Sequence, residues 1–74
     1  MAGGRIAAIG ERAAIEGFGL AGVLVCAART PAEVLAQWRS LPPDVALVIL
    51  TPAAAPAVPA RTPGALPLTA VMPG

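Results

Sequence analysis

Residues 17–27 read GFGLAGVLVCA, and this stretch decides the fold. Its first six letters fit the pattern G-x-G-x-x-G, which in the right setting holds the pyrophosphate of a dinucleotide. That role requires a strand before the glycines and a helix after them, because the free N–H groups at the start of the helix bind the phosphates. Here the apolar, β-branched residues 23–27 follow and predict a strand. The glycines are therefore predicted to lie at a helix-to-strand junction, not in a phosphate loop.

The residues before this junction predict a strand and then a helix. Residues 5–9 form a short apolar run closed by Gly10, which is typical of a buried strand. Gly10 is suited to cap the helix that follows, and Gly22 is suited to end it. The apolar positions of that helix recur at spacings of three and four residues, at Ala14, Ile15, Phe18 and Ala21.

The glycines of this helix have a structural interpretation. We expect Gly17 and Gly19 to let the end of the helix pack closely on the sheet, since glycine has no side chain to keep the two apart. Phe18 and Leu20 are then expected to face the core. The structural motif predicted for this region consists of Gly10, Gly17, Phe18, Leu20 and Gly22.

The clearest local signal follows the second predicted strand, at residues 30–33. Thr30 is expected to cap a helix, Pro31 to occupy its first position, and Glu33 to reach back and complete a capping box. Val34, Leu35, Trp38 and Leu41 fall on one face of this helix, whereas Gln37, Arg39 and Ser40 fall away from it. The helix is predicted to end before the two prolines at 42 and 43.

Three further segments complete the pattern. Residues 45–50, VALVIL, read as a central parallel strand, and residues 68–72 as a fourth strand. Residues 52–67 are proline-rich, and we expect a polyproline-like surface crossover there, with a short turn of helix capped by Thr51 as the alternative. The alternation of strands and helices predicts one α/β domain over residues 1–74. Its fold is a small four-stranded parallel sheet with flanking helices, a receiver-like or Rossmann-like three-layer sandwich whose third helix is short or missing.

The composition narrows the classes of function. The chain has 74 residues, 57% of them hydrophobic, and a net charge of +1 from scattered arginines, so it has no basic stripe for nucleic acid. The longest charge-free apolar run before the prolines, residues 17–28, is shorter than the roughly 20 residues a membrane-spanning helix needs. Early charges at Glu11, Arg12 and Glu16 interrupt any leader-like stretch. These features predict a cytoplasmic protein without direct membrane insertion.

No residue set typical of catalysis is apparent. The chain has no histidine and one cysteine, Cys26, which lies in an apolar predicted strand and reads as a small buried hydrophobe. A dinucleotide site needs an acidic residue after the second strand, but Asp44 precedes the third strand instead. Thr51 lies at a strand end but is explained by capping. We therefore expect no catalytic residues, no metal and no cofactor.

Several segments, in order and spacing, resemble the F subunit of the V/A-type (vacuolar-type) ATP synthases. The segments that carry this resemblance are Ile6–Glu11, Glu16–Val23, Thr30–Glu33, Asp44–Thr51, Leu66–Leu68 and Met72–Gly74. Its most specific part is the G-F-x-L-A-G motif, and it covers nearly all of the chain outside residues 52–65. The sequence departs from the family at Glu11, where Asp is usual, in the proline-rich segment, and in lacking the C-terminal helix that follows in family members.

The resemblance implies a non-catalytic member of the central stalk. Such a protein binds the coiled-coil rotor shaft, formed by the D-type subunit, beneath the catalytic A/B ring, and supports the coupling of ATP turnover to proton or sodium transport. It implies a cytoplasmic location, peripheral to the membrane as part of the ATPase complex. The alternative from the residues alone is a stand-alone or truncated α/β interaction or signalling module with no role in an ATPase.

The partner contacts are expected at the carboxyl ends of the strands, where open α/β sheets bind ligands and partners. The candidates there are Glu11, Arg12, Thr51, Pro73 and Gly74. Ordinary solvated loops are the alternative interpretation of each of these positions.

Overall fold

The structure is a computed structural model that describes residues 4–59 and 64–73. In chain order its elements are β1 (Arg5–Gly10), α1 (Arg12–Ile15), η1 (Glu16–Ala21), β2 (Leu24–Ala27), α2 (Pro31–Arg39), β3 (Val45–Leu50), η2 (Ala55–Ala57) and β4 (Leu68–Val71), where η marks a 3₁₀ helix. Within the described ranges, no helix has both the length and the apolar character to cross a bilayer.

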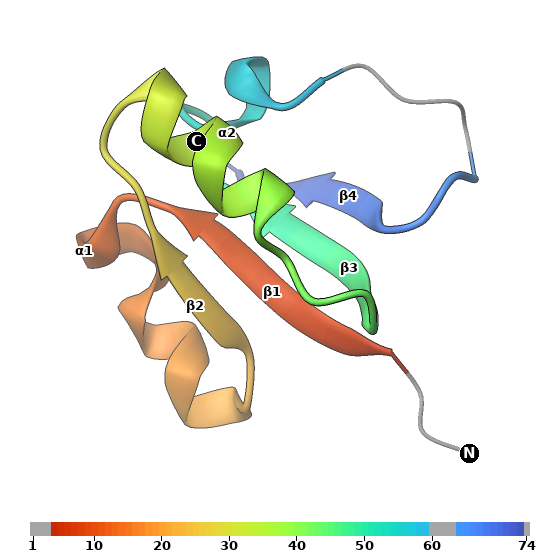
Figure 1. Ribbon diagram of the computed structural model, residues 1–74. Helices are drawn as coiled ribbons and strands as arrows, with labels where there is room; N and C mark the ends of the chain where they lie inside the picture. The colour runs from red at the N-terminus through yellow and green to blue at the C-terminus, as the bar shows by residue number, and fades with distance from the viewer. Residues whose placement is uncertain (1–3, 60–63, 74) are drawn as a thin grey trace.

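The four strands form one parallel sheet in the order β2-β1-β3-β4 (Figure 1). In the centre of the sheet, Ala8 pairs with Val25 on one side and with Ile49 on the other. Ile49 in turn pairs with Ala70 of β4. The order matches the first four strands of a doubly wound sheet, and it confirms the predicted α/β fold class.

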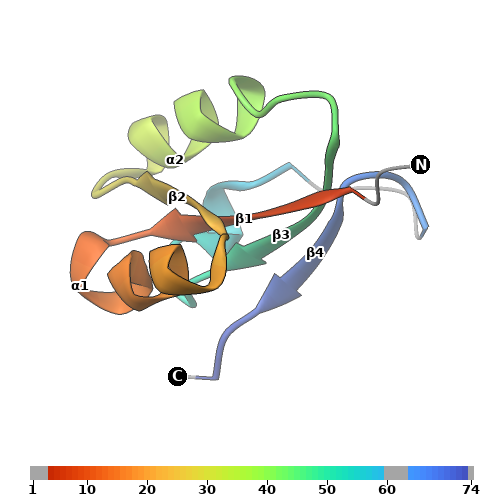
Figure 2. The same cartoon turned by 90° about the horizontal axis from the view of Figure 1, so that it is seen from below.

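The helices cover the two faces of the sheet unequally. α1 and η1 lie on one face, under β1 and β2, while α2 lies on the other (Figure 2). The main core is on the α2 face, where η2 also packs. Its buried residues are Ala7, Ile9, Cys26, Ala28, Val34, Val45, Val48, Leu50 and Ala54. The opposite face is covered by α1 and η1 only over half of the sheet, so Ile6 and Leu68 keep 38% and 47% of their surface exposed.

The G-x-G-x-x-G stretch lies at the end of a helix and directly before β2, as its flanks predict. The α-helix is shorter than expected, because it changes at Glu16 into the 3₁₀ helix η1. Gly22 ends η1 with φ of 81°, a left-handed conformation that favours glycine. Its N–H donates to the Gly19 carbonyl at 3.2 Å, and the N–H of Val23 donates to the Phe18 carbonyl at 3.2 Å. These two bonds form the pattern that commonly terminates helices at a glycine.

The other glycines have different roles from those predicted. A Cβ at Gly17 would meet no atom within 4 Å, and one at Gly19 would lie 3.5 Å from Val25 Cγ2, an ordinary contact. The prediction that these two glycines are needed for close packing is therefore wrong. Phe18 is half-buried, and the side chain of Leu20 lies outside the described part of the structure.

Close packing requires a glycine at position 10, and this residue does not cap the helix α1. The N-cap of α1 is Glu11, not Gly10. Gly10 is buried where β1 and β3 end together, and a Cβ built on it would lie only 2.6 Å from Thr51 Oγ1 and 2.9 Å from Thr51 Cβ. A side chain at position 10 would therefore collide with Thr51.

The helix α2 begins as the sequence predicts. Thr30 Oγ1 accepts a hydrogen bond from the Glu33 N–H at 3.1 Å, and Pro31 occupies the first helical turn. The Glu33 carboxylate reaches back one residue further than a capping box requires, and accepts from the N–H of Arg29 at 2.6 Å. The start of the helix is thus tied to the end of the preceding loop.

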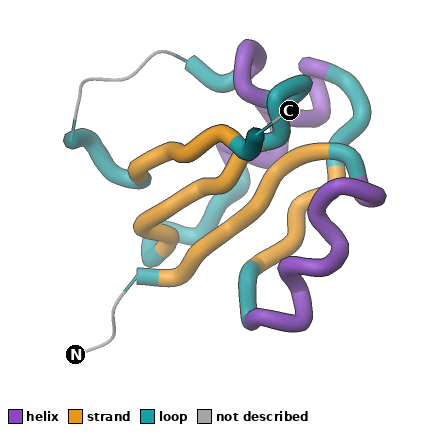
Figure 3. The backbone as a smooth tube through the Cα atoms, turned by 180° about the vertical axis from the view of Figure 1, so that it is seen from behind, coloured by secondary structure: helices purple, strands orange, loops and turns teal. Residues whose placement is uncertain are grey.

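The segment after β3 contains a short helix and not a polyproline stretch. The N–H groups of Ala54 and Ala55 both donate to the Thr51 carbonyl at 3.0 Å, and Thr51 Oγ1 accepts from the Ala54 N–H at 3.2 Å. The 3₁₀ helix Ala55–Ala57 follows, so over residues 51–58 the alternative of a Thr51-capped turn is correct. Residues 60–63 of the crossover lie outside the described residues. Figure 3 shows the loop on both sides of that gap leading to β4.

Candidate functional site

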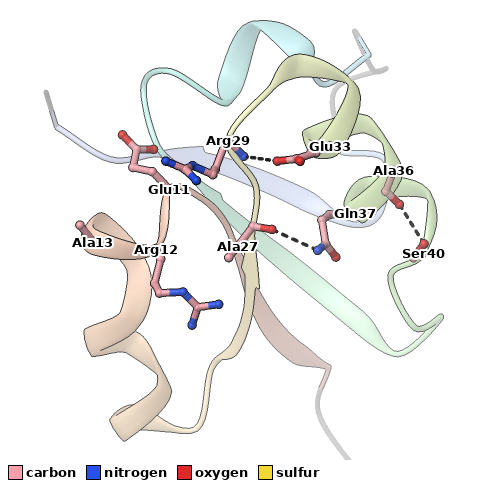
Figure 4. A pocket seen from close by; sticks show the side chains of 9 residues that line it. All are labelled: Glu11, Arg12, Ala13, Ala27, Arg29, Glu33, Ala36, Gln37 and Ser40. Carbon is pink, nitrogen blue, oxygen red and sulfur yellow. Dashed lines mark hydrogen bonds between the residues drawn. The ribbon is translucent and has the colours of Figure 1, made fainter.

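A cleft of about 820 Å³ opens at the carboxyl ends of β1 and β2, beside α2 (Figure 4). Nine residues line it: Glu11, Arg12, Ala13, Ala27, Arg29, Glu33, Ala36, Gln37 and Ser40. Three different parts of the chain supply them, because β1 and β2 end side by side and α2 crosses back over them toward β3. The cleft therefore follows from the winding of the sheet, at the edge where open α/β sheets bind ligands.

Two polar side chains on the α2 side of the cleft are hydrogen-bonded to backbone carbonyls of the protein. Gln37 is half-buried, and its Nε2 donates to the carbonyl of Ala27 at 3.2 Å. Ser40 Oγ donates to the carbonyl of Ala36 at 2.8 Å. The sequence pattern placed Gln37 and Ser40 simply away from the buried face, but Gln37 in fact joins α2 to the end of β2.

The two carboxylates of the cleft are also held locally. The Glu33 carboxylate accepts from the backbone N–H of Arg29. The pKa of Glu11 is lowered, first by a hydrogen bond to its own backbone and then by the hydroxyl of Thr51. Both groups therefore have donors close by in the protein, and these donors favour the charged form of a carboxylate.

The two guanidinium groups of the cleft have no such partner among the described residues. Arg12 and Arg29 are exposed, and in Figure 4 the Arg29 side chain extends toward Glu11, whereas the Arg12 side chain extends away from it. Within residues 4–59 and 64–73 the ion pair present is Arg5 with Asp44, whose Nε and Oδ2 are 2.8 Å apart at the other end of the sheet. The cleft thus offers two cations with available N–H donors beside two carboxylates, of which Glu33 is hydrogen-bonded to the backbone.

The fold brings only some of the predicted partner-contact residues together in the cleft. Glu11 and Arg12 both line the cleft, as the rule for strand ends suggested. Thr51 is 1% exposed, so its side chain offers no surface to a partner and the prediction of a contact there is wrong. Pro73 is exposed but follows β4, two strands away from β1, and does not line the cleft. Gly74 lies outside the described residues.

Sequence reasoning missed three important residues of the cleft. Arg29 is the first charged residue after β2, so the same rule that selected Glu11 and Arg12 could have found it. Glu33 was assigned only to capping, and Gln37 only to the solvated face. Their positions depend on how α2 lies across the sheet, which periodicity does not specify.

Within the described residues there is no group of three or more His, Cys, Asp or Glu side chains placed to hold a metal ion. Cys26 is buried in β2, and burial raises the pKa of its thiol, which disfavours the reactive thiolate. The Ser40 hydroxyl already donates to a carbonyl.

Comparisons with protein-family models, with curated proteins and with solved structures found no match to this chain. The fold and the cleft define its class: a small, doubly wound α/β protein with an open, charged cleft at the carboxyl edge of a parallel sheet.

Proposed function

We propose that this chain is a non-catalytic central-stalk component of a V/A-type ATPase or ATP synthase. It binds the coiled-coil shaft, the D-type subunit, and through it supports the coupling of ATP turnover in the A/B ring to proton or sodium transport. It acts in the cytoplasm, peripheral to the membrane. The observation that carries the proposal is the charge pattern of the cleft, in which Arg12 and Arg29 lack carboxylate partners among the described residues while the Glu33 carboxylate is hydrogen-bonded to the Arg29 N–H.

The pattern fits a partner that presents carboxylates from a helix. Residues three or four apart on a helix lie on the same face, so two acidic residues of one helix can both face the cleft that holds Arg12 and Arg29. Arginine is well suited to this contact because its planar fork binds carboxylates in two parallel hydrogen bonds. Glu11 and Glu33 help to fix the partner, since they repel acidic side chains that approach in another register.

The sequence resemblance supports the same function at the residues that build the cleft. The end of β1 and the following Glu11 belong to one of the segments similar to the F subunit, and Gly10 is the residue that allows β1 and β3 to end in close contact. The segment at Thr30–Glu33 is another, and it begins the helix that forms the opposite wall. The resemblance therefore falls on the elements that shape the proposed surface.

Co-purification with the D-type subunit encoded in the same genome tests the proposal. The two chains are expected to elute as one complex at micromolar concentration, and the affinity is expected to fall as salt is raised, because exposed charges are screened. Arg12→Glu and Arg29→Glu should each weaken binding by roughly threefold to tenfold. Arg39→Glu is the matched control, since Arg39 is also exposed, at the end of α2, but does not line the cleft.

Separate elution of the two wild-type chains would overturn the proposal. Equal loss of binding in the Arg39 control would place the contact elsewhere. The second candidate, a stand-alone interaction module, is favoured by the brevity of η2, which has only three residues where the family has a fuller helix. It predicts that the cleft binds an acidic helical segment with the same two arginines but does not retain the D-type subunit.

A further inference from the structure

β4 is an open edge of the sheet. It stands last in the strand order, and all four of its residues, Leu68–Val71, are exposed (Figure 1). The other edge strand, β2, is half-buried to buried, because α1 and η1 flank it on one face and α2 on the other. An uncovered edge carries unpaired backbone N–H and C=O groups that can accept a further strand.

The backbone of β4 specifies which groups are available. The N–H of Met72, just after β4, donates to the carbonyl of Leu50 in β3 at 2.8 Å. Since backbone groups point to alternate sides along a strand, those of Leu68 and Ala70 also face β3. The N–H and C=O groups of Thr69 and Val71 therefore face the open edge.

Charged side chains and proline within the strand, two devices that usually protect such an edge, are absent from this one, although it has only four residues and follows Pro67. Leu68–Val71 contains no charged residue and no proline, and its pairing with β3 runs in register over all four residues. The end residues Leu68 and Val71 remain 47% and 56% exposed. The edge is thus regular, neutral and apolar, which disfavours a charged partner strand.

We propose that β4 pairs in antiparallel orientation with β4 of a second copy, about a two-fold axis at Ala70. In this register Thr69 of one copy lies opposite Val71 of the other, and each of these pairs exchanges two N–H···O=C bonds. Leu68 lies opposite Met72, and Ala70 opposite Ala70 of the second copy. The two sheets then form one continuous sheet, in which every backbone group at the joined edge has a partner.

The side chains match this register. The positions that do not exchange hydrogen bonds bring the two backbones closest, with Cα atoms about 4.5 Å apart, and the small Ala70 occupies the central one. Opposite Leu68 stands the unbranched Met72, and the β-branched pair Thr69 and Val71 is favourable across strands. The edge is therefore complementary to itself in both size and charge.

This surface is separate from the cleft proposed to bind the shaft. The cleft is lined by residues at the ends of β1 and β2 and on α1 and α2, and none of its lining residues belongs to β3 or β4. The pairing of β4 thus goes beyond the proposed function, and either inference can fail while the other holds.

A charge-exchange experiment tests the pairing. The 74-residue chain is expected to be a dimer in light scattering coupled to gel filtration, and to dissociate on dilution. Thr69→Lys with Val71→Lys puts like charges across the joined edge and should give monomers, as should Thr69→Glu with Val71→Glu. Mixing the two variants should restore a dimer, since each lysine then faces a glutamate. Lysine or glutamate pairs at Ala32 and Arg39, exposed on α2, should leave the wild-type dimer unchanged.

A cross-linking experiment tests the register. In a Cys26→Ala background, Ala70→Cys should form an intermolecular disulfide readily under mild oxidation, because the two Cα atoms are within the range that a disulfide spans. Thr69→Cys should cross-link far more slowly, since it faces Val71. A wild-type chain that is monomeric at all concentrations, a dimer unaffected by the lysine pair, or faster cross-linking at position 69 would each overturn the proposal.

Discussion

At the scale of single residues, Gly10 and Thr51 are in close contact next to the cleft residue Glu11. Thr51 is buried, its hydroxyl accepts from Ala54 and interacts with Glu11, and its N–H donates to the Ile9 carbonyl at 3.2 Å. One threonine therefore connects the end of β1, the end of β3 and the turn that follows. The sequence predicted its capping role, but its partner-contact role was inferred from position alone, and burial overrides position.

Gly10→Ala is expected to destabilise the protein by about 2 kcal/mol or more, because the added methyl group collides with Thr51 and the two strand ends must move apart. Gly17→Ala is the control, since its Cβ enters open space and alanine lowers the conformational entropy of the unfolded chain. That variant should be neutral or more stable by up to about 1 kcal/mol. Urea unfolding measures both, and equal shifts in the two variants would contradict this account of Gly10.

Protonation of the Asp44 carboxylate makes the free energy of unfolding depend on pH. Arg5 Nε donates to its Oδ2 at 2.8 Å and Arg5 Nη2 to its Oδ1 at 3.2 Å, and this hydrogen bonding lowers the pKa of Asp44 below its ordinary value of 3.8. Between the folded-state pKa of Asp44 and pH 3.8, the unfolded state binds more protons than the folded state, so acidification favours unfolding. The stabilisation from the Arg5–Asp44 pair is therefore full above pH 3.8 and is lost as the pH falls through the folded-state pKa. Asp44→Asn should flatten this part of the stability curve.

Glu11 provides the comparison for that pH experiment. Its pKa is lowered from an ordinary value of 4.5, so the stabilisation from Glu11 is lost in the same direction but begins to fall at higher pH. Thermal unfolding between neutral pH and about pH 3 should show a shallower slope in each variant, with the change in Glu11→Gln appearing first on acidification. If Asp44→Asn follows the wild-type curve in parallel, the ion pair contributes nothing to folding.

At the scale of elements, α2 and η1 show what local sequence does and does not determine. α2 could be predicted almost completely, since its start depends on three neighbouring residues, Thr30, Pro31 and Glu33, whose roles are local. η1 could not, because spacings of three and four residues fit α and 3₁₀ turns equally over so short a stretch. Glycines at 17 and 19 weaken the α-helix, and the 3₁₀ form results.

The same distinction applies to the cleft. Glu11 and Arg12 could be predicted because they directly follow a strand, and Arg29 satisfies the same condition. Gln37 could not, since its bond to the Ala27 carbonyl depends on where α2 crosses β2. Residues fixed by their own segment are accessible to sequence reasoning, whereas contacts between segments distant in the chain require the packed structure.

The cap of α2 gives a test at this scale. Thr30→Ala removes the acceptor of the Glu33 N–H and should lower the free energy of unfolding by about 1 kcal/mol. Thr30→Ser keeps the oxygen and should be close to the wild type. Denaturant titration of the three proteins measures the difference, and a serine variant as unstable as the alanine variant would show that the threonine methyl group, not the hydrogen bond, matters.

At the scale of the whole molecule, the many apolar residues lie in two different environments, the buried interior and the exposed strand β4. The sequence predicted strands buried on both faces, and this holds for the end of β1, where Ala7, Ala8 and Ile9 have no exposed surface. It does not hold for β4, which is exposed throughout. The main core lies on the α2 face, and Ala8 and Ile15 are fully buried on the other face, whose half beyond α1 and η1 remains available to solvent or to a partner.

Two isoleucines of β1 allow these faces to be compared within one strand. Ile9 is fully buried on the α2 face, whereas Ile6, three residues away and so on the opposite face, is 38% exposed. Replacing each by threonine keeps a β-branched side chain, so strand propensity changes equally. This difference in burial predicts that Ile9→Thr loses about 3 kcal/mol, from lost apolar burial and a buried hydroxyl, and that Ile6→Thr loses less than about 1 kcal/mol. If the two variants lose comparable free energy of unfolding in urea, the face that carries Ile6 is also covered in solution. If the loss in Ile6→Thr depends on protein concentration, a second copy of the chain covers that face.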